Sequence, residues 1–216
     1  MKNLNLYLIR HGQTEWNTKD QMQGSQNSPL TENGILGAKI TGRFLKDIPF
    51  IAAYSSPQQR AVETRDYILS EHNGAVPAKT IDGLREMDFG LWEGQPVPEL
   101  RKLPEFLDYM HNPDKFDGAK NQGENYLEVL ERMQKSLDEI VRDTEQDSGN
   151  ILIVSHGTAL RLLLSVINGV HWHNHRDDNY FPRMLNTSIS KVNYRGDGVH
   201  GEYHLEYFNN VDHITE

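Results

Sequence analysis

The stretch Leu6-Tyr-Leu-Ile-Arg-His-Gly-Gln-Thr-Glu-Trp-Asn17 changes abruptly from apolar to polar residues. Its first four residues, Leu6 to Ile9, are typical of a buried strand in a parallel sheet. Gly12 ends this strand directly after Arg10 and His11. Ligands of open α/β sheets bind at the carboxyl ends of the strands, so this pair lies where chemistry is expected. Arginine suits phosphate and histidine suits nucleophilic or proton-transfer chemistry, whereas a surface cation and a structural loop histidine are the alternative interpretation.

The composition sets limits on the class of protein. The 216-residue chain is 37% hydrophobic and 25% charged, carries a net charge of -9 and has a pI near 5.6. Its length favours one domain over residues 1–216. We expect a cytoplasmic protein without a membrane partner, because no apolar run approaches the roughly 18 residues of a membrane span and the first strand leaves no room for a signal peptide. The acidic charge argues against nucleic acid, and the absence of cysteine excludes disulfides and thiol catalysis.

Apolar runs and helical patterns alternate along the chain. Further strands are predicted at 49–54, 78–81, 151–154, 187–194 and 203–208, the last two as an antiparallel pair. Helices are predicted to start at the N-caps Thr31 and Ser56, with Pro57 as the first helical residue after Ser56, and again after Glu124 and at Thr158. The expected helix ends are Lys46, the turn 72–74, Ser148-Gly149 and Val166. This order predicts a three-layer α/β/α sandwich, with a mostly parallel central sheet, an antiparallel edge and a small helical cap inserted at about 95–122.

Three strand-to-helix junctions carry similar side chains. The first has Arg10 and His11, the second has Ser55-Ser56-Pro57 followed by Arg60, and the third has Ser155-His156-Gly157. Each would place a cation or an imidazole beside a helix N-terminus, which presents free N–H groups and the positive end of the helix dipole. A structural role is the more common one at any single junction. The recurrence at three equivalent positions therefore favours a phosphate-binding cradle.

The motifs, taken in order, resemble those of the histidine phosphatase superfamily, also called the phosphoglycerate mutase-like family. Four segments carry most of the resemblance: Leu8-Ile-Arg-His-Gly-Gln-Thr-Glu-Trp-Asn17, Ser55-Ser-Pro-Gln-Gln-Arg-Ala-Val-Glu-Thr64, Leu84-Arg-Glu-Met-Asp-Phe-Gly-Leu-Trp-Glu-Gly94 and Val154-Ser-His-Gly157. Asn186-Thr-Ser188 and Asn209-Asn-Val-Asp-His213 add to it. Each motif alone is weak or moderate, but the ordered set is specific and runs nearly from end to end.

The resemblance implies a double-displacement phosphoryl transfer. His11 would be the nucleophile and would form a phosphohistidine, which is labile enough to pass the phosphate on. Arg10, Arg60 and His156 would neutralise the phosphoryl oxygens in the transition state. Asn17 would add a hydrogen-bond donor to the same oxygens. No metal or cofactor is implied, because cationic side chains take the place of a metal.

The resemblance also implies a proton donor and a pocket lining. Glu86 would protonate the leaving alkoxide and then activate water, although the residues alone do not separate it from Glu93. Gln23 and Gly24 match a position that lines the phosphate pocket. Gln21 stands where the phosphatase branch often has arginine, and this departure leaves the specificity for the leaving group open.

Some other residues have a competing interpretation. His171-Trp-His-Asn-His175 with Asp177 and Asp178 has metal-ligating side chains, but alternating histidines in a loop rarely converge. A polar loop at the rim of the pocket is the alternative. Trp16 and Trp92 are interpreted as packing residues.

Three functions are considered, and the first is favoured. The first is a metal-independent phosphatase that acts on a small phosphorylated metabolite. The second is a cofactor-dependent phosphoglycerate mutase; this branch has a longer and more basic segment after the acid motif, whereas 95–122 offers only Arg101, Lys102, Lys115 and Lys120. The third is an inactive regulatory or binding member, against which the intact set of catalytic residue types argues. The substrate and a homo-oligomeric state are left open.

Overall fold

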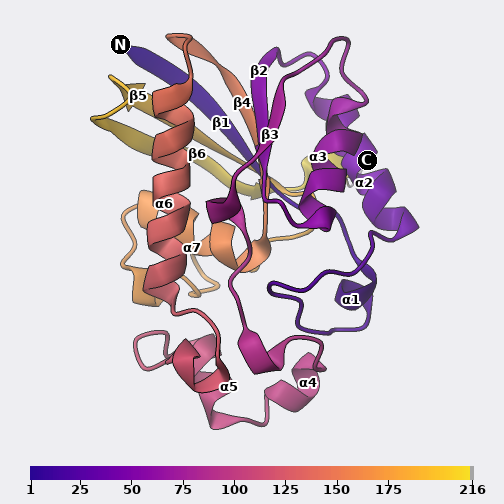
Figure 1. Ribbon diagram of the computed structural model, residues 1–216, viewed down its shortest axis with the longest axis vertical. Helices are drawn as coiled ribbons and strands as arrows, with labels where there is room; N and C mark the ends of the chain where they lie inside the picture. The colour runs from indigo at the N-terminus through magenta and orange to yellow at the C-terminus, as the bar shows by residue number, and fades with distance from the viewer. Residues whose placement is uncertain (215–216) are drawn as a thin grey trace.

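The computed structural model describes residues 1–214, and six of its strands form one sheet in the order β3-β2-β4-β1-β5-β6 (Figure 1). The strands are β1 Lys2–Arg10, β2 Phe50–Ser55, β3 Ala78–Thr80, β4 Ser148–Ser155, β5 Ile189–Gly196 and β6 Gly201–Asn210. Strands β1 to β4 are parallel to their neighbours among these four, whereas β5 is antiparallel to β1 and β6 to β5. The predicted mostly parallel sheet with an antiparallel edge is confirmed.

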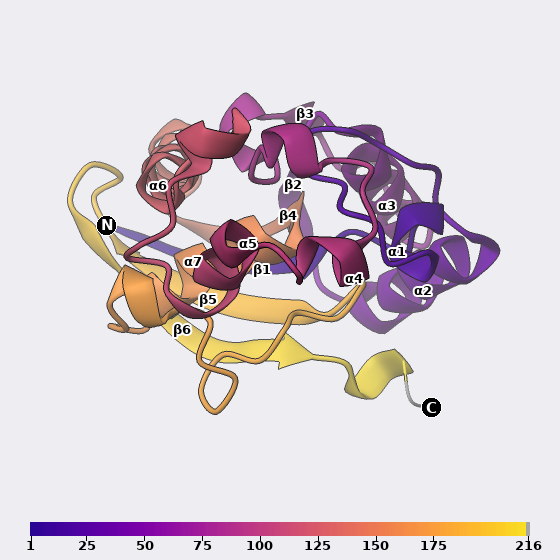
Figure 2. The ribbon, with the colours of Figure 1, turned by 90° about the horizontal axis from the view of Figure 1, so that it is seen from below.

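Helices cover both faces of the sheet (Figures 1 and 2). Helices α2 Glu32–Leu45 and α3 Gln59–Leu69 lie on one face, and α6 Tyr126–Asp143 and α7 Gly157–Ile167 lie on the other. Leu4, Leu6 and Leu8 of β1 belong to the hydrophobic core beneath α6 and α7, while Tyr7 and Ile9 belong to the core beneath α2 and α3. Successive strand residues face opposite sides, so one continuous apolar run supplies both cores. The three-layer arrangement is therefore as predicted.

The helix on the second junction starts later than predicted. Thr31 is the N-cap of α2, as expected, and its hydroxyl accepts an N–H from the first turn at 3.0 Å. The N-cap of α3 is Gln58, so Ser56 is not the cap and Pro57 is not the first helical residue. The Ser56 hydroxyl instead accepts the Gln58 N–H at 3.2 Å, which holds a non-helical turn. This helix ends at Leu69, before the predicted closing glycine.

The long helix α6 also ends earlier than predicted. It stops at Asp143, and Ser148-Gly149 opens β4 instead of closing the helix. The Lys2 ammonium, at the start of β1, donates to the carbonyls of Val141 at 2.6 Å and Arg142 at 3.0 Å. It therefore satisfies carbonyls that have no partner within the helix. This contact joins residues about 140 positions apart, which explains why local signals did not reveal the helix end.

Short helices cover the end of the sheet where the parallel strands finish (Figure 2). They are α4 Val97–Leu100, α5 Pro104–His111 and a 3-10 helix at Gly118–Asn121, all within the cap segment 95–122. Rings of Trp92, Phe106 and Tyr109 lie 5.1 to 5.9 Å apart and join the cap to the main core. The cap therefore packs tightly against the main core.

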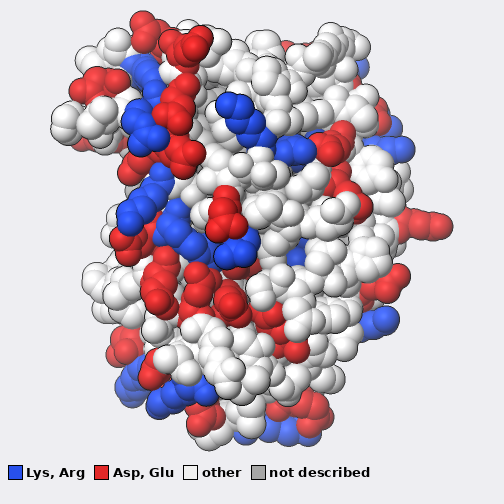
Figure 3. Space-filling model, in the orientation of Figure 1, with Lys and Arg blue, Asp and Glu red and all other residues white. Residues whose placement is uncertain are grey.

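The remaining short elements are α1 Glu15–Thr18, which was not predicted, and 3-10 helices at Asp82–Leu84, Gly90–Trp92, Trp172–Asn174 and Asp212–Ile214. Helix α1 lies at the same end of the sheet as the cap (Figure 1). Acidic and basic side chains are interspersed along α6 on the face shown in Figure 3. Within residues 1–214, no helix has both the length and the hydrophobicity needed to cross a membrane.

Candidate active site

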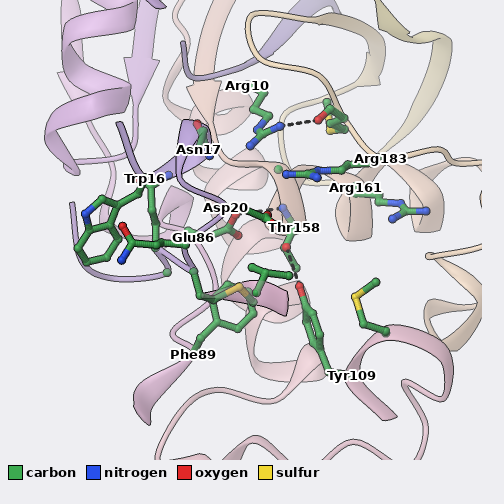
Figure 4. Close-up of a pocket in the computed structure, with 18 of the residues that line it drawn as sticks. Arg10, Trp16, Asn17, Asp20, Glu86, Phe89, Tyr109, Thr158, Arg161 and Arg183 are labelled. Carbon is green, nitrogen blue, oxygen red and sulfur yellow. Dashed lines mark hydrogen bonds between the residues drawn. The ribbon is translucent and has the colours of Figure 1, made fainter. Parts of the chain in front are cut away.

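An open cavity of roughly 160 Å³ lies at the carboxyl ends of the strands, between the sheet and the cap (Figure 4). It has room for about ten water molecules, which suits a small molecule. Seven residues predicted for the site line it: Arg10, His11, Asn17, Gln23, Gly24, Arg60 and Glu86. The eighth, His156, is fully buried and is not among the described lining residues.

His11 lies one residue beyond β1, where its N–H donates to the Ser155 carbonyl at 3.0 Å. Its Nδ1 is 2.7 Å from the carbonyl oxygen of Gly12. A carbonyl only accepts, so Nδ1 carries the proton and Nε2 has the free lone pair. Burial lowers the pKa of His11 well below 6.5, and the charges of Arg60 and Arg10 lower it further. At neutral pH the ring is therefore uncharged and nucleophilic at Nε2.

Two buried guanidinium groups flank this histidine. Arg10 donates to the Met184 carbonyl at 2.6 Å, and Arg60 donates to the carbonyls of Gln26 at 2.6 Å and Gly24 at 2.7 Å. In the described part of the chain, neither Nε has a hydrogen-bond partner. Burial lowers the pKa of both arginines to about 10, so both stay charged at neutral pH. Among residues 1–214, neither Arg10 nor Arg60 forms an ion pair with a carboxylate. The two guanidiniums therefore form a fixed positive site.

His156 lies directly against the nucleophile. The two imidazole centroids are 5.2 Å apart and the rings are tilted by 56°. Neither nitrogen of His156 has a hydrogen-bond partner among residues 1–214. Burial lowers its pKa well below 6.5, and the charge of Arg60 lowers it further. The structure thus brings His156 to His11, while its contact with a phosphoryl group stays a prediction.

Two side-chain amides present donors to the cavity. The Asn17 Oδ1 accepts the Thr14 N–H at 3.1 Å and the Asn186 amide at 3.3 Å. The Gln23 Oε1 accepts the Ser28 hydroxyl at 3.1 Å. These bonds hold the two amides by their oxygens, and their NH₂ groups can donate to a ligand.

The structure separates the two carboxylates that the sequence left equivalent. Glu86 lines the cavity, and its oxygens accept the N–H groups of Thr158 at 3.0 Å and Ala159 at 2.9 Å in the first turn of α7. Glu93 is not among the described lining residues. Its carboxylate accepts the Ser25 N–H at 2.7 Å and holds the loop that follows the lining residues Gln23 and Gly24. Glu86 is therefore the candidate proton donor.

Sequence reasoning missed a linking residue, Gln58. Its Nε2 donates to the Gly24 carbonyl at 2.7 Å, and its Oε1 accepts the Glu86 N–H at 2.9 Å. One side chain thus fixes both the loop that carries Gly24 and the candidate acid. Its place beside a predicted helix start was the available signal in the sequence. Glutamine as a residue type does not indicate that the side chain is buried.

The outer part of the cavity was also missed. It is lined by Arg101 of the cap and by Arg161, Arg176 and Arg183 from α7 and the segment after it. Of these four arginines, only Arg101 belongs to the basic residues of 95–122 that the sequence singled out. Trp16, which the sequence favours as a packing residue, also borders the cavity (Figure 4).

The histidine-rich loop shows little convergence. The rings of His171 and His173 lie 4.0 Å apart, but neither residue is among the described lining residues. His175 is buried against Tyr126, with ring centroids 4.5 Å apart. In the part of the chain that the structure describes, no group of three or more His, Cys, Asp or Glu could hold a metal ion.

Fold and site together define a class: an α/β protein with an uncharged histidine between fixed guanidiniums at an arginine-lined cavity. The family model of the histidine phosphatase superfamily (branch 1) matches residues 6–206, and the chain belongs to this superfamily. A relative named "Probable phosphoglycerate mutase GpmB" from Proteus mirabilis is 32% identical over 214 residues, which cover 99% of this chain and 96% of the relative.

Solved structures agree with this membership. Bacillus stearothermophilus YhfR has a TM-score of 0.86 at 31% identity, with coverage of 98% of this chain and 99% of that chain. A mutant phosphoserine phosphatase from Entamoeba histolytica, in complex with phosphoserine, has a TM-score of 0.80 at 27% identity, with coverage of 98% and 99%. The resemblance predicted from the motifs is confirmed.

Proposed function

We propose that this protein is a metal-independent phosphatase that hydrolyses a small phosphorylated metabolite through a phosphohistidine at His11. One observation carries the proposal: the Gly12 carbonyl fixes the proton of His11 on Nδ1, which leaves Nε2 as the nucleophile between two buried arginines. Electrostatic stabilisation by such fixed charges is usually the largest contribution to this type of catalysis.

The chemistry proceeds in two displacements. In the first, His11 Nε2 forms a bond to phosphorus while the ester P–O bond breaks, and Glu86 in its acid form gives a proton to the leaving oxygen. In the second, the Glu86 carboxylate takes a proton from water, which attacks phosphorus and releases inorganic phosphate from the histidine. Arg10 and Arg60 compensate the charge of the phosphoryl oxygens in both steps.

A phosphoglycerate mutase is the second candidate, and the name of the relative from Proteus mirabilis favours it. In a mutase the phosphohistidine would return its phosphoryl group to the bound product instead of water. The similarity to a phosphoserine phosphatase favours hydrolysis. Hydrolysis is therefore the first choice.

The first test is hydrolysis of p-nitrophenyl phosphate without added metal and in the presence of EDTA. We expect full activity under both conditions. The change His11→Ala should lower kcat by about two or three orders of magnitude, because the covalent nucleophile is removed. His171→Ala, at an exposed position outside the cavity lining, is the matched control. Unchanged turnover of the His11 variant would contradict the mechanism.

The second test separates hydrolysis from mutase activity. The protein is incubated with 3-phosphoglycerate, and the products are followed by phosphorus NMR. Net inorganic phosphate supports the phosphatase. Formation of 2-phosphoglycerate that depends on 2,3-bisphosphoglycerate supports the mutase instead.

A further inference from the structure

The candidate proton donor Glu86 lies on a segment that is neither helix nor strand. Residues 85–89 connect the 3-10 helix Asp82–Leu84 to the 3-10 helix Gly90–Trp92. A general acid must be held within hydrogen-bond reach of the oxygen that it protonates, and a small displacement of such a group lowers the rate. The position of Glu86 therefore depends on the groups that hold this backbone.

Arg132 of α6 holds the backbone with all five N–H donors of its guanidinium in use. Its Nη1 donates to the carbonyls of Gly83 at 2.9 Å and Arg85 at 2.6 Å. Its Nη2 donates to the Glu86 carbonyl at 3.0 Å. Nε and Nη2 also donate to the two carboxylate oxygens of Glu124, both at 2.8 Å. One planar group therefore joins three carbonyls to one carboxylate.

Glu124 holds the same segment on the other side of Glu86. Its Oε2 accepts the Asp88 N–H at 2.9 Å, and its own N–H donates to the Asp88 carbonyl at 2.8 Å. Burial raises the pKa of Glu124, but the hydrogen bonds and the charge of Arg132 outweigh burial and lower the pKa below its usual value. The carboxylate therefore stays ionised at neutral pH and keeps its ion pair with Arg132.

The segment lies close against α6, where the 3-10 helix Asp82–Leu84 packs on this long helix (Figure 1). A Cβ at Gly83 would clash with the Ser136 hydroxyl and would lie 2.8 Å from the Arg132 carbonyl. Glycine thus permits the close approach that lets one guanidinium reach three carbonyls.

Glu86 is therefore held at both ends of its own backbone. Its N–H donates to Gln58 Oε1 at 2.9 Å, and its carbonyl accepts from Arg132. Its carboxylate accepts two N–H groups from the first turn of α7. Residues 58 and 132 lie on different faces of the sheet, so the position of the acid depends on both layers of helices.

We infer that Arg132 and Glu124 are positioning residues for Glu86: their ion pair fixes the backbone of residues 83–88 so that the Glu86 carboxyl lies where it protonates the leaving oxygen. This inference rests on the proposed phosphatase mechanism. It adds two residues that are not among the described lining residues of the cavity and that act through the acid. A purely structural ion pair would support the fold without any bearing on proton transfer.

The test uses two leaving groups that differ in their need for a proton. The p-nitrophenolate ion is a weak base that leaves without protonation, whereas the alkoxide of glycerol 1-phosphate is a strong base that requires the acid. Because kcat/KM reports the steps up to release of the leaving group, the ratio of kcat/KM for the alkyl ester to that for the aryl ester measures proton donation. Glu86→Gln should lower this alkyl-to-aryl ratio by about 10²-fold, the usual scale for a general acid.

Two variants of the ion pair should lower the same ratio. Arg132→Lys keeps a positive charge beside Glu124, but the three donors of an ammonium cannot replace five, and the ratio should fall by about tenfold as the acid is displaced. Glu124→Gln removes the ion pair at nearly constant side-chain size and should act in the same direction. Lys135→Met on the same helix breaks an exposed ion pair with Glu131 and should leave the ratio unchanged. Melting temperatures show which variants are folded.

A double-mutant cycle separates positioning from support of the fold. In the Glu86→Gln background, Arg132→Lys should change the ratio by less than about twofold, because the acid through which Arg132 acts is absent. If the lysine variant does not fold, Glu124→Gln takes its place in the cycle.

Two different failures can be told apart. A folded variant of the ion pair that keeps the parent ratio, loses activity equally on both esters, or lowers the ratio as much in the Glu86→Gln background would overturn this inference and leave the proposed phosphatase intact. An unchanged ratio in Glu86→Gln itself, or absence of phosphate release from both esters, would overturn the proposed mechanism, and the inference would fall with it.

Discussion

The inner and the outer part of the cavity are built in different ways. The inner arginines, Arg10 and Arg60, are buried at strand and helix ends and are held by backbone carbonyls. Of the outer arginines, Arg161 lies on α7 and also donates to a backbone carbonyl, that of Phe181. Arg176 and Arg183 come from a loop, and Arg176 is held by the side chain of Tyr109. Backbone partners fix the position of a charge whatever the neighbouring side chains are. In the proposed reaction, the inner part would therefore hold the constant phosphoryl group, and the outer part would meet the group that varies between substrates.

The largest contrast should appear when one arginine of each part is changed. With p-nitrophenyl phosphate, Arg60→Met should lower kcat/KM by about 10²- to 10³-fold, because a donor to the transition state is lost. Arg183→Gln should lower it by less than about tenfold on the same scale. Steady-state kinetics and the melting temperature of each variant are measured together. Equal losses in two folded variants would remove the distinction between inner and outer parts.

A second contrast compares two glycines, one in the inner part of the cavity and one after the C-terminal end of α7, which is not among the described lining residues. Gly24 has φ +55°, and a Cβ there would lie 2.1 Å from Glu93 Oε1 and 2.9 Å from the Phe89 ring. Gly169 has φ +82°, but a Cβ there would meet nothing within 4 Å. Gly169→Ala should thus cost only the backbone strain, about 1 kcal/mol of the free energy of unfolding.

Gly24→Ala adds the clash to the same strain and should cost about 2 kcal/mol or more. It should also lower activity, because the Gly24 carbonyl accepts hydrogen bonds from Arg60 and Gln58. Urea unfolding and p-nitrophenyl phosphate hydrolysis check both effects. Equal stability of the two alanine variants would show that the inner loop yields more easily than its contacts suggest.

The smallest expected effect is the response of stability to acid. Burial lowers the pKa of His156 well below 6.5 and that of His175 to about 3. Below pH 6.5 these two histidines bind protons in the unfolded chain but stay uncharged in the folded protein. Their contribution to the free energy of unfolding is therefore fully present above pH 6.5 and is lost as the pH falls. Each histidine should contribute about 1 kcal/mol per pH unit. For His175 this window extends from pH 6.5 down to about 3.

The variants His156→Gln and His175→Gln should each flatten this dependence by about one proton. The free energy of unfolding in urea is measured from pH 7.5 to pH 5 for both variants and the parent protein. A dependence as steep as that of the parent would mean that the substituted histidine is protonated in the folded protein. The comparison covers one histidine behind the inner part and one in the loop that carries Arg176.

Local sequence was sufficient for the inner part of the site. Arg10, His11 and Arg60 each follow a strand that an apolar run predicts, and parallel strands bring their carboxyl ends together. Burial on both faces of β1 follows from the same continuous apolar run. The order of the motifs was enough to indicate the superfamily that the comparisons then showed.

Tertiary structure alone decided the rest. Glu86 and Glu93 are seven positions apart, and only the first meets the N-terminus of α7. Gln58 links the Gly24 carbonyl to the Glu86 N–H, and these two partners are 34 and 28 residues away along the chain. The outer arginines line one cavity because the cap and the loop after α7 close over it. Periodicity and turn signals report on neighbours along the chain, whereas these contacts join segments that only the completed fold brings together.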